Sequence, residues 1–90
     1  MAFRVAPSAG KHGVTAEDIL TVLTRPVHRV DQFDRGPGGP TTLFIGLSCT
    51  GRMLEVLALI TPPADVFVFH AMLLRPETAA RAGFYDQEED

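Results

Sequence analysis

Two apolar runs in the middle of the chain, 42–48 and 53–60, constrain the fold more than any other feature. The link between them contains Gly51, which adopts a positive φ without strain, so the pattern predicts two strands joined by a hairpin turn. An isolated two-stranded hairpin is only marginally stable in water, and the chain must therefore supply a further strand. The run Val-Phe-Val-Phe-His-Ala at 66–71 follows a proline-containing turn and is the expected third strand.

The second of these strands has no continuous polar face. Its positions 54, 56, 58 and 60 are all apolar, and the intervening positions are apolar except for Glu55. An antiparallel sheet with one solvated face shows a regular alternation of apolar and polar residues. Both faces of this sheet therefore need a cover, and the second cover is expected to be either the C-terminal helix or another chain. On this ground the sequence indicates a partner, either a second copy of the chain or another protein.

The clearest helix in the sequence spans residues 15–24. Thr15 is a favourable N-cap, and Asp18 stands three residues later, as in a capping box. Pro26 ends the helix. The apolar residues expected to face the sheet are Ala16, Ile19, Leu20 and Leu23.

Shorter elements flank this helix and the hairpin. A second helix is expected within residues 73–83, where Pro76 suits the first turn and Gly83 the end. Residues 27–34 are polar and alternate only loosely, which predicts an edge strand with a bulge. Residues 3–5 are compatible with a short additional strand.

Together these elements predict an α+β fold, in which a small antiparallel sheet of three or four strands forms a meander packed with two or three short helices. The fold is expected to be a single domain over residues 1–85. Residues 86–90 carry four acids and no base, and they are expected to form a disordered tail.

The composition excludes several functional classes. The single cysteine, Cys49, cannot form an internal disulfide or a zinc site, and at the end of the hairpin it is interpreted as a small, semi-buried residue. The three histidines lack the i, i+4 spacing of a metal site and no glycine-rich phosphate loop precedes a helix, so no metal or other cofactor is expected. No apolar run is long enough to cross a bilayer or to form a signal peptide, and we expect a cytoplasmic protein.

The formal net charge of −3 comes from residues 86–90, and the rest of the chain is rich in arginine. The whole chain has eight basic residues and eleven acids, and four of the acids lie in 86–90, so the rest of the chain carries eight bases and seven acids. Seven of the eight bases are arginines, which bind phosphate and carboxylate groups in a fixed geometry. His28, in the polar edge strand, is interpreted as a surface histidine without a function.

Short motifs in a fixed order give the chain a resemblance to a known family. They are Lys11-His12-Gly13-Val14, the helix start Glu17-Asp18, Phe44-Ile45-Gly46, Gly51-Arg52-Met53-Leu54-Glu55-Val56, His70-Ala71-Met72, and the final Arg75 and Glu77. Over residues 11–80 this arrangement resembles the BrnT toxins, the ribonuclease half of a type II toxin–antitoxin pair. The resemblance implies a RelE/ParE-like fold, cleavage of RNA without a metal, and a DNA-binding antitoxin that covers the toxin.

Metal-free cleavage of RNA needs a base for the 2′-hydroxyl, cations for the charge that develops on phosphorus, and an acid for the leaving oxygen. Either histidine could act as acid or base, and the arginines could bind phosphate. The residues to which the resemblance assigns catalysis are His12, His70, Arg52 and Arg75. The residues expected to contribute to RNA binding are Lys11, Arg4 and Arg29.

The chain departs from the family pattern in ways that remove positive charge. Met72 stands where the family typically has an arginine, only ten residues precede Lys11, and the C-terminal segment ends in acids rather than bases. With these departures, the resemblance favours a divergent BrnT-like toxin component, in which RNA cleavage or binding is weakened or lost, over a working ribonuclease. The alternative hypothesis is a non-catalytic interaction module that homodimerises or binds an antitoxin-like chain through an apolar sheet face. No membrane partner is expected.

Overall fold

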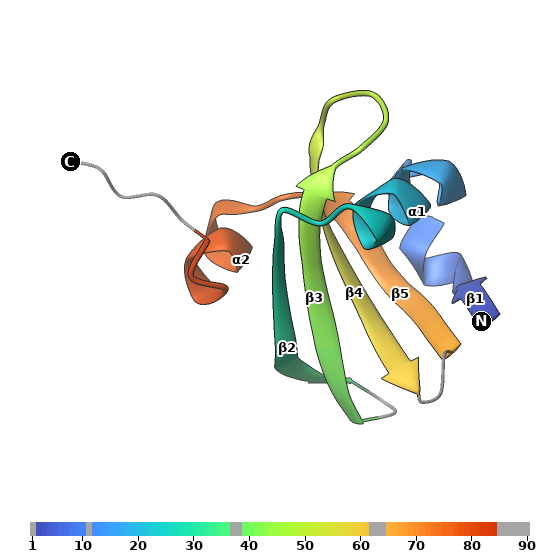
Figure 1. Cartoon of the computed structure of the whole chain (residues 1–90), viewed down its shortest axis with the longest axis vertical. Helices are drawn as coiled ribbons and strands as arrows, with labels where there is room; N and C mark the ends of the chain where they lie inside the picture. Colours follow the sequence, from blue (N-terminus) through green and yellow to red (C-terminus); the bar gives the residue numbers. More distant parts are fainter. Residues whose placement is uncertain (1, 11, 37–38, 62–64, 85–90) are drawn as a thin grey trace.

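The computed structural model describes residues 2–10, 12–36, 39–61 and 65–84 (Figure 1). In chain order the elements are strand β1 (Ala2–Val5), the 3₁₀ helix η1 (Pro7–Gly10), helix α1 (Ala16–Thr24), strands β2 (His28–Gly36), β3 (Gly39–Leu47), β4 (Met53–Thr61) and β5 (Asp65–Leu73), and helix α2 (Pro76–Arg81). The strands form one sheet in the order β1-β5-β4-β3-β2. The α+β class predicted from the sequence is confirmed.

The sheet is larger than predicted, and it is mixed. The strands from β2 to β5 form the expected antiparallel meander, but β1 adds a fifth strand that runs parallel to β5, from Ala2 beside Asp65 to Val5 beside Val68. The prediction of three or four antiparallel strands is therefore wrong in strand number and in the direction of this pair. A parallel pair joins segments that are distant in sequence, so no local turn signal in the sequence indicates it.

The central hairpin forms as predicted. Gly51 has a φ of 84° in the link between β3 and β4. The Ser48 hydroxyl accepts hydrogen bonds from the backbone N–H groups of Thr50 and Arg52, at 3.2 and 3.1 Å. A buried serine thus holds the polar link in place.

Strand β2 lies at the edge of the sheet, and its pairing with β3 is irregular between Val30 and Asp34, as its loose alternation predicted. Within this irregularity Gln32 has a φ of 54°, a left-handed conformation that is uncommon for residues other than glycine. An irregular, polar edge strand discourages pairing with the edge of another sheet.

Helix α1 begins with the predicted capping box. The Thr15 hydroxyl accepts a hydrogen bond from the N–H of Asp18 at 3.1 Å, and the Asp18 carboxylate accepts one from the N–H of Thr15 at 3.4 Å. The buried residues of the helix are Ile19 and Val22, whereas Leu20 is 48% exposed. The helix is therefore rotated relative to the face that its periodicity predicted.

Gly46 of β3 accounts for this orientation. A Cβ atom at this position would lie 3.3 Å from Cγ1 of Val22 and 3.3 Å from the carbonyl oxygen of Arg25, which is tighter than ordinary contact. The missing side chain therefore lets the C-terminal end of α1 lie directly on β3, with Val22 against the strand.

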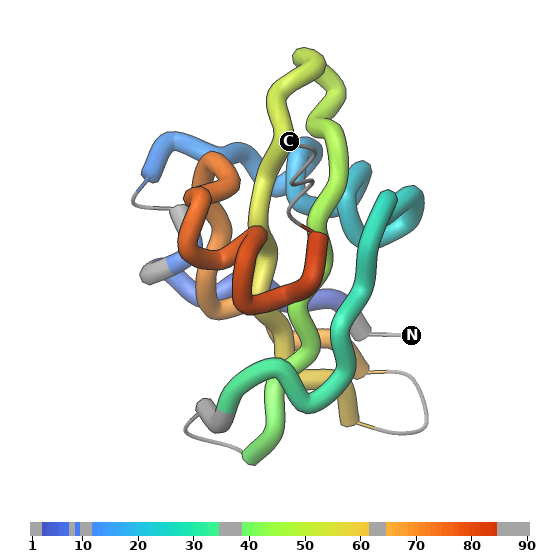
Figure 2. Tube along the Cα trace, turned by 90° about the vertical axis from the view of Figure 1, so that its left-hand side faces the viewer, coloured from blue at the N-terminus to red at the C-terminus, as the bar shows by residue number. Residues whose placement is uncertain are grey.

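The two α-helices lie on opposite faces of the sheet, and α2 crosses in front of it in Figure 2. The core on the α1 side contains Ala9, Val14, Ile19, Val22, Phe44, Leu54, Val56, Ala58, Val68 and Ala71. The smaller core on the α2 side contains Leu43, Ile45 and Ala82, with Val30, Phe33, Met53, Leu57, Leu74 and Phe84 packed against it. The chain thus covers parts of both sheet faces with its own helices.

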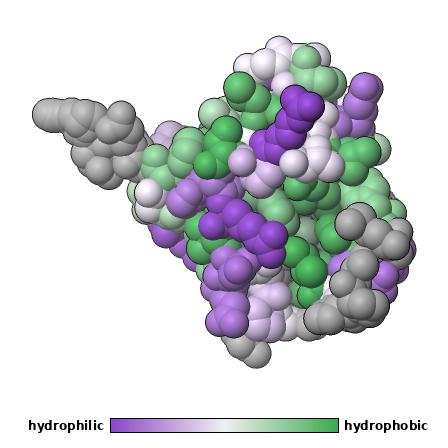
Figure 3. Space-filling model, viewed as in Figure 1, coloured by the Kyte–Doolittle hydropathy of each residue, from purple (hydrophilic) through white to green (hydrophobic). Residues whose placement is uncertain are grey.

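Some large apolar side chains stay at the surface. They are Leu20, Val27, Leu47, Ile60 and Leu73, which are between 37 and 54% exposed. On the surface seen in Figure 3, apolar and polar groups are interspersed. Among the described residues, no helix combines the length and the apolar character needed to cross a membrane.

Candidate functional site

A buried carboxylate lies at the centre of the candidate site. Glu55 stands in β4 between Leu54 and Val56, which both belong to the core on the α1 side. Because side chains alternate along a strand, Glu55 points to the α2 side of the sheet. Its side chain is fully buried, at 0% exposure. A buried ionised carboxylate is costly unless it is paired and hydrogen-bonded, so its neighbours determine what this site can do.

His70 and Arg75 are these partners. Nε2 of His70 donates to Oε2 of Glu55 at 2.8 Å, and the backbone N–H of Arg75 donates to Oε1 at 2.9 Å. The Arg75 guanidinium donates through Nη2 to Oε2 at 2.7 Å, and its Nε lies 3.3 and 3.2 Å from the two carboxylate oxygens. Both oxygens of the carboxylate therefore receive charge-assisted hydrogen bonds, which offset the cost of burying the charge.

The ladder between β4 and β5 brings these groups together. His70 lies opposite Leu57, and the register shift next to this pair puts His70 on the same side of the sheet as Glu55. Arg75 follows β5 as the N-cap residue of α2. The N–H of Leu74 donates to the carbonyl of Met53, the first residue of β4, at 3.0 Å. This bond holds the chain that leads into α2 beside β4.

The pairing also sets the protonation state of the site. Burial raises the pKa of the Glu55 carboxyl, but hydrogen bonds from His70, Arg75 and Thr78 outweigh it and lower the pKa from 4.5 to about 2. The hydrogen bonds to Glu55 raise the pKa of Arg75. Both groups are therefore charged at neutral pH. Because an ionised carboxylate only accepts hydrogen bonds, the ring of His70 carries a proton on Nε2 in this contact.

His12 extends the site to the surface. It lies between η1 and α1, and its ring stands edge-on to that of His70, with the ring centroids 6.0 Å apart and the planes at 71°. His12 is exposed, and the side chains of His70 and Arg75 are 22% and 42% exposed. We refer to Glu55, His70, Arg75 and His12 as the Glu55 cluster. Two imidazoles and a guanidinium thus reach solvent above a buried carboxylate.

Three of the four residues predicted to be catalytic meet in the Glu55 cluster, namely His12, His70 and Arg75. Arg52 does not. It is exposed in the hairpin link, and within the described part of the chain its guanidinium makes no ion pair or hydrogen bond to the cluster.

The residues predicted to bind RNA are dispersed. Lys11 lies outside the described residues. The guanidinium carbon of Arg4 lies 5.1 Å from the centre of the Phe67 ring. That of Arg29 lies 5.2 Å from the centre of the Phe44 ring, and because Phe44 belongs to the core on the α1 side, Arg29 lies across the sheet from the Glu55 cluster.

His28 is half-buried and bonded, contrary to its interpretation as a surface residue without a function. Its Nε2 lies 2.7 Å from the carbonyl oxygen of Ala82, to which it donates, and its ring is 5.4 Å from that of Phe84. Ala82 is the C-cap residue of α2. His28 therefore ties the end of α2 to the edge strand, which is a structural role.

Cys49 is exposed rather than semi-buried, and its thiol donates to Oδ1 of Asp18 at 2.9 Å. This hydrogen bond raises the pKa of the Cys49 thiol and lowers the pKa of the Asp18 carboxyl. Since the thiolate is the nucleophile, a thiol with a raised pKa reacts slowly at neutral pH. The geometry supports no catalytic role for this cysteine.

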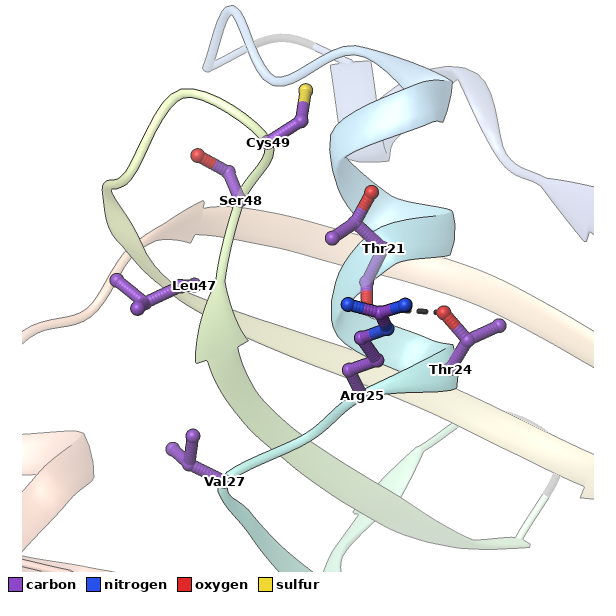
Figure 4. A pocket seen from close by; sticks show the side chains of 7 residues that line it. All are labelled: Thr21, Thr24, Arg25, Val27, Leu47, Ser48 and Cys49. Atoms are coloured by element: carbon purple, nitrogen blue, oxygen red, sulfur yellow. Dashed lines mark hydrogen bonds between the residues drawn. The ribbon is translucent and has the colours of Figure 1, made fainter.

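A pocket of about 650 Å³ opens between α1 and the end of β3, apart from the Glu55 cluster (Figure 4). Its lining consists of Thr21, Thr24, Arg25, Val27, Leu47, Ser48 and Cys49. The hydroxyls of Thr21 and Thr24 donate to backbone carbonyls of their own helix, so they are already bonded within α1. The described ranges contain no group of three or more histidine, cysteine or acidic residues arranged to hold a metal.

No protein-family model, curated protein or solved structure matches this chain. The chemistry of the Glu55 cluster is therefore argued below from its own geometry.

Glu55 is the member of the cluster that the sequence did not assign to the site. The signal that could have found it is a single charge inside an otherwise apolar strand, because such a charge requires partners when both faces of the strand are covered. The identity of those partners depends on the register between β4 and β5, which the sequence pattern does not specify.

Proposed function

We propose that the Glu55 cluster is a metal-independent site for RNA cleavage, and that the chain is a divergent BrnT-like toxin component with a RelE/ParE-like fold. The observation that carries this proposal is the convergence of His12, His70 and Arg75 on Glu55. These residues come from four different places in the chain, namely the segment between η1 and α1, the strands β4 and β5, and the N-cap of α2. They are the groups that metal-free phosphodiester cleavage requires.

The two histidines suit the proton transfers. A neutral imidazole removes the proton from a 2′-hydroxyl, whose oxygen attacks the adjacent phosphorus. The bond from phosphorus to the 5′ oxygen then breaks, and a protonated imidazole gives its proton to that leaving oxygen. The products are a 2′,3′-cyclic phosphate and a free 5′-hydroxyl. With ring centroids 6.0 Å apart, His12 and His70 are close enough to act on one phosphodiester.

Glu55 positions His70 for this role. The carboxylate holds Nε2 at 2.8 Å, which fixes the tautomer and the ring orientation and leaves Nδ1 as the nitrogen available for proton transfer. Glu55 is a positioning residue rather than a catalytic one, because its fully buried side chain cannot contact RNA.

Arg75 suits the stabilisation of the phosphorane. A guanidinium has five N–H donors, and the contacts with Glu55 engage Nε and Nη2. The side chain is 42% exposed, so further donors can reach a phosphate at the surface. Hydrogen-bond donors fixed before the reaction stabilise developing negative charge without reorganisation.

The test is cleavage of a single-stranded RNA labelled with a fluorophore and a quencher, by micromolar purified protein with a chelator present. We expect cleavage by the natural chain. His12→Ala and His70→Ala are each expected to lower the rate about a hundredfold or more, because each removes a proton-transfer group. No cleavage by the natural chain, or equal cleavage by all three proteins, would retire the proposal.

The chain offers a matched histidine control. In His28→Gln, the side-chain amide can still donate to the carbonyl of Ala82, so α2 stays in place. This variant removes a histidine without touching the Glu55 cluster, and it is expected to cleave at the natural rate.

The second candidate function is the interaction module, which homodimerises or binds an antitoxin-like chain. The observation that favours it is the exposure of Val27 and Leu47, at 54% and 48%, in the lining of the pocket beside α1. Light scattering tests the self-association that this candidate includes. A dimer in which Leu47→Asp restores a monomer supports this module, whereas a monomer at high protein concentration counts against self-association.

A further inference from the structure

The arginine–phenylalanine pair of Arg4 and Phe67 lies on the same side of the sheet as the Glu55 cluster. Arg4 of β1 stands beside Phe67 of β5 in the parallel ladder, with its guanidinium carbon 5.1 Å from the centre of the phenylalanine ring. Phe3 and Val5, on either side of Arg4, pack against the core on the α1 side. Because side chains alternate along a strand, Arg4 points to the opposite side, towards which Glu55 also points.

Phe67 follows the same alternation. Its neighbours Val66 and Val68 belong to or pack against the core on the α1 side, so the ring of Phe67 lies on the other face. His70 is three residues further along β5, and a strand advances about 3.3 Å per residue, which places the two side chains roughly 10 Å apart along the strand. The register shift between them shortens this path.

Arg4 differs from the arginines of the two comparable pairs, which each lie beside a carboxylate. Arg29 over Phe44 also donates to Asp31 at 2.9 Å, and the Arg81 guanidinium over Phe33 lies 3.6 Å from the Asp34 carboxylate. Within the described ranges, Arg4 makes no ion pair. An exposed guanidinium without a carboxylate partner is available to an anion.

We propose that Arg4 and Phe67 form a stacking subsite for the nucleobase that flanks the scissile phosphate, so that the substrate of the Glu55 cluster is single-stranded RNA. This inference rests on the proposed function. A guanidinium plane stacks on a nucleobase, as an aromatic ring does, and its N–H groups bond to phosphate at the same time. A base is free to stack in this way only where it is not paired, which excludes the interior of a duplex.

The test is binding, measured by fluorescence anisotropy, of a short RNA whose 2′-hydroxyls are methylated so that it cannot be cleaved. A set of such RNAs, each with one base removed, locates the position at which stacking matters. We expect removal of one particular base to weaken binding to the natural chain about tenfold. Arg4→Gln removes the stacking guanidinium, and Phe67→Leu removes the ring over which that guanidinium is held. In both variants, removal of that base is therefore expected to have little further effect.

Arg81→Gln is the matched control, since it breaks a comparable arginine–phenylalanine pair whose guanidinium already lies beside the Asp34 carboxylate. It is expected to keep the tenfold response to the missing base. Equal binding by Arg4→Gln, Phe67→Leu and the natural chain would overturn the inference. A uniform loss of binding for every RNA in Arg4→Gln would also overturn it, because that result indicates phosphate contact without stacking.

The experiments distinguish a failure of the proposed subsite from a failure of the proposed cleavage. If the natural chain binds the methylated RNA with the expected pattern but does not cut RNA, the subsite stands and the proposed cleavage fails. If it cuts RNA while the missing base and the two variants leave binding unchanged, cleavage stands and the subsite is wrong. Preference for a duplex over the single strand counts against the subsite.

Discussion

Replacement of Glu55 by glutamine removes the buried charge of the cluster and keeps the size of the side chain. The pKa of this carboxyl is lowered from 4.5 to about 2 by its hydrogen bonds. A difference of about 2.5 pKa units corresponds to about 3 kcal/mol of folding free energy at pH 7. Because the folded pKa is the lower one, this contribution is complete well above pH 4.5 and is lost as the pH falls through about 2.

The assay is urea unfolding of the natural chain and of Glu55→Gln between pH 7 and pH 3. The other carboxyls titrate in both proteins, so their contributions cancel in the difference in unfolding free energy. We expect the natural chain to be more stable by about 3 kcal/mol at pH 7 and by only about 1 kcal/mol at pH 3. Glu77→Gln is the control, because that carboxylate is 68% exposed and 3.9 Å from Arg75, and its difference should stay near zero.

A difference that does not change with pH would refute this reasoning, since it would mean that Glu55 is not held ionised by its partners. A Glu55→Gln variant as stable as the natural chain at pH 7 would refute it as well.

Three further outcomes follow from single contacts. Gly46→Val is expected to lower the unfolding free energy by about 2 kcal/mol, because its side chain would collide with the end of α1, and thermal unfolding measures this loss. Asp18→Asn should speed alkylation of Cys49 at pH 8, since the carboxylate that raises the pKa of the thiol is gone; an unchanged rate contradicts that cause. His28→Ala should accelerate amide exchange in α2 while His28→Gln should not, and equal exchange would show that the bond to α2 does not hold the helix.

Local patterns in the sequence predicted most of the fold. Gly51 marked the central hairpin, Thr15 and Asp18 marked the start of α1, and Pro76 marked the start of α2, because each acts on its own neighbours in the chain. The pairing of β1 with β5 could not be predicted in the same way, since it joins residues 2–5 to a strand about sixty positions later.

The buried face of α1 shows a second limit. Periodicity placed Leu20 on the sheet, whereas the structure leaves it 48% exposed and buries Val22 instead. Four apolar residues at helical spacing define a face only approximately, and the final rotation depends on the close contact at Gly46. That contact joins helix α1 to strand β3, so the sequence of the helix alone does not indicate it.

The candidate site was predictable in part for a related reason. The resemblance to the BrnT toxins selected His12, His70 and Arg75, but it also selected Arg52, which lies outside the cluster. Only the three-dimensional structure shows that Arg52 lies apart from the other three residues. Glu55 joins the site because one shift in the β4–β5 ladder turns His70 towards it.

The most direct test of the central claim is the chemistry of the cleavage product. The substrate is a DNA strand with one ribonucleotide, incubated with the protein and a chelator and analysed by mass spectrometry. If the Glu55 cluster cleaves through the 2′-hydroxyl, the strand is cut only on the 3′ side of the ribonucleotide, and the upstream fragment ends in a 2′,3′-cyclic phosphate. An intact strand, a cut between deoxynucleotides, or a downstream fragment that carries a 5′-phosphate would contradict the account.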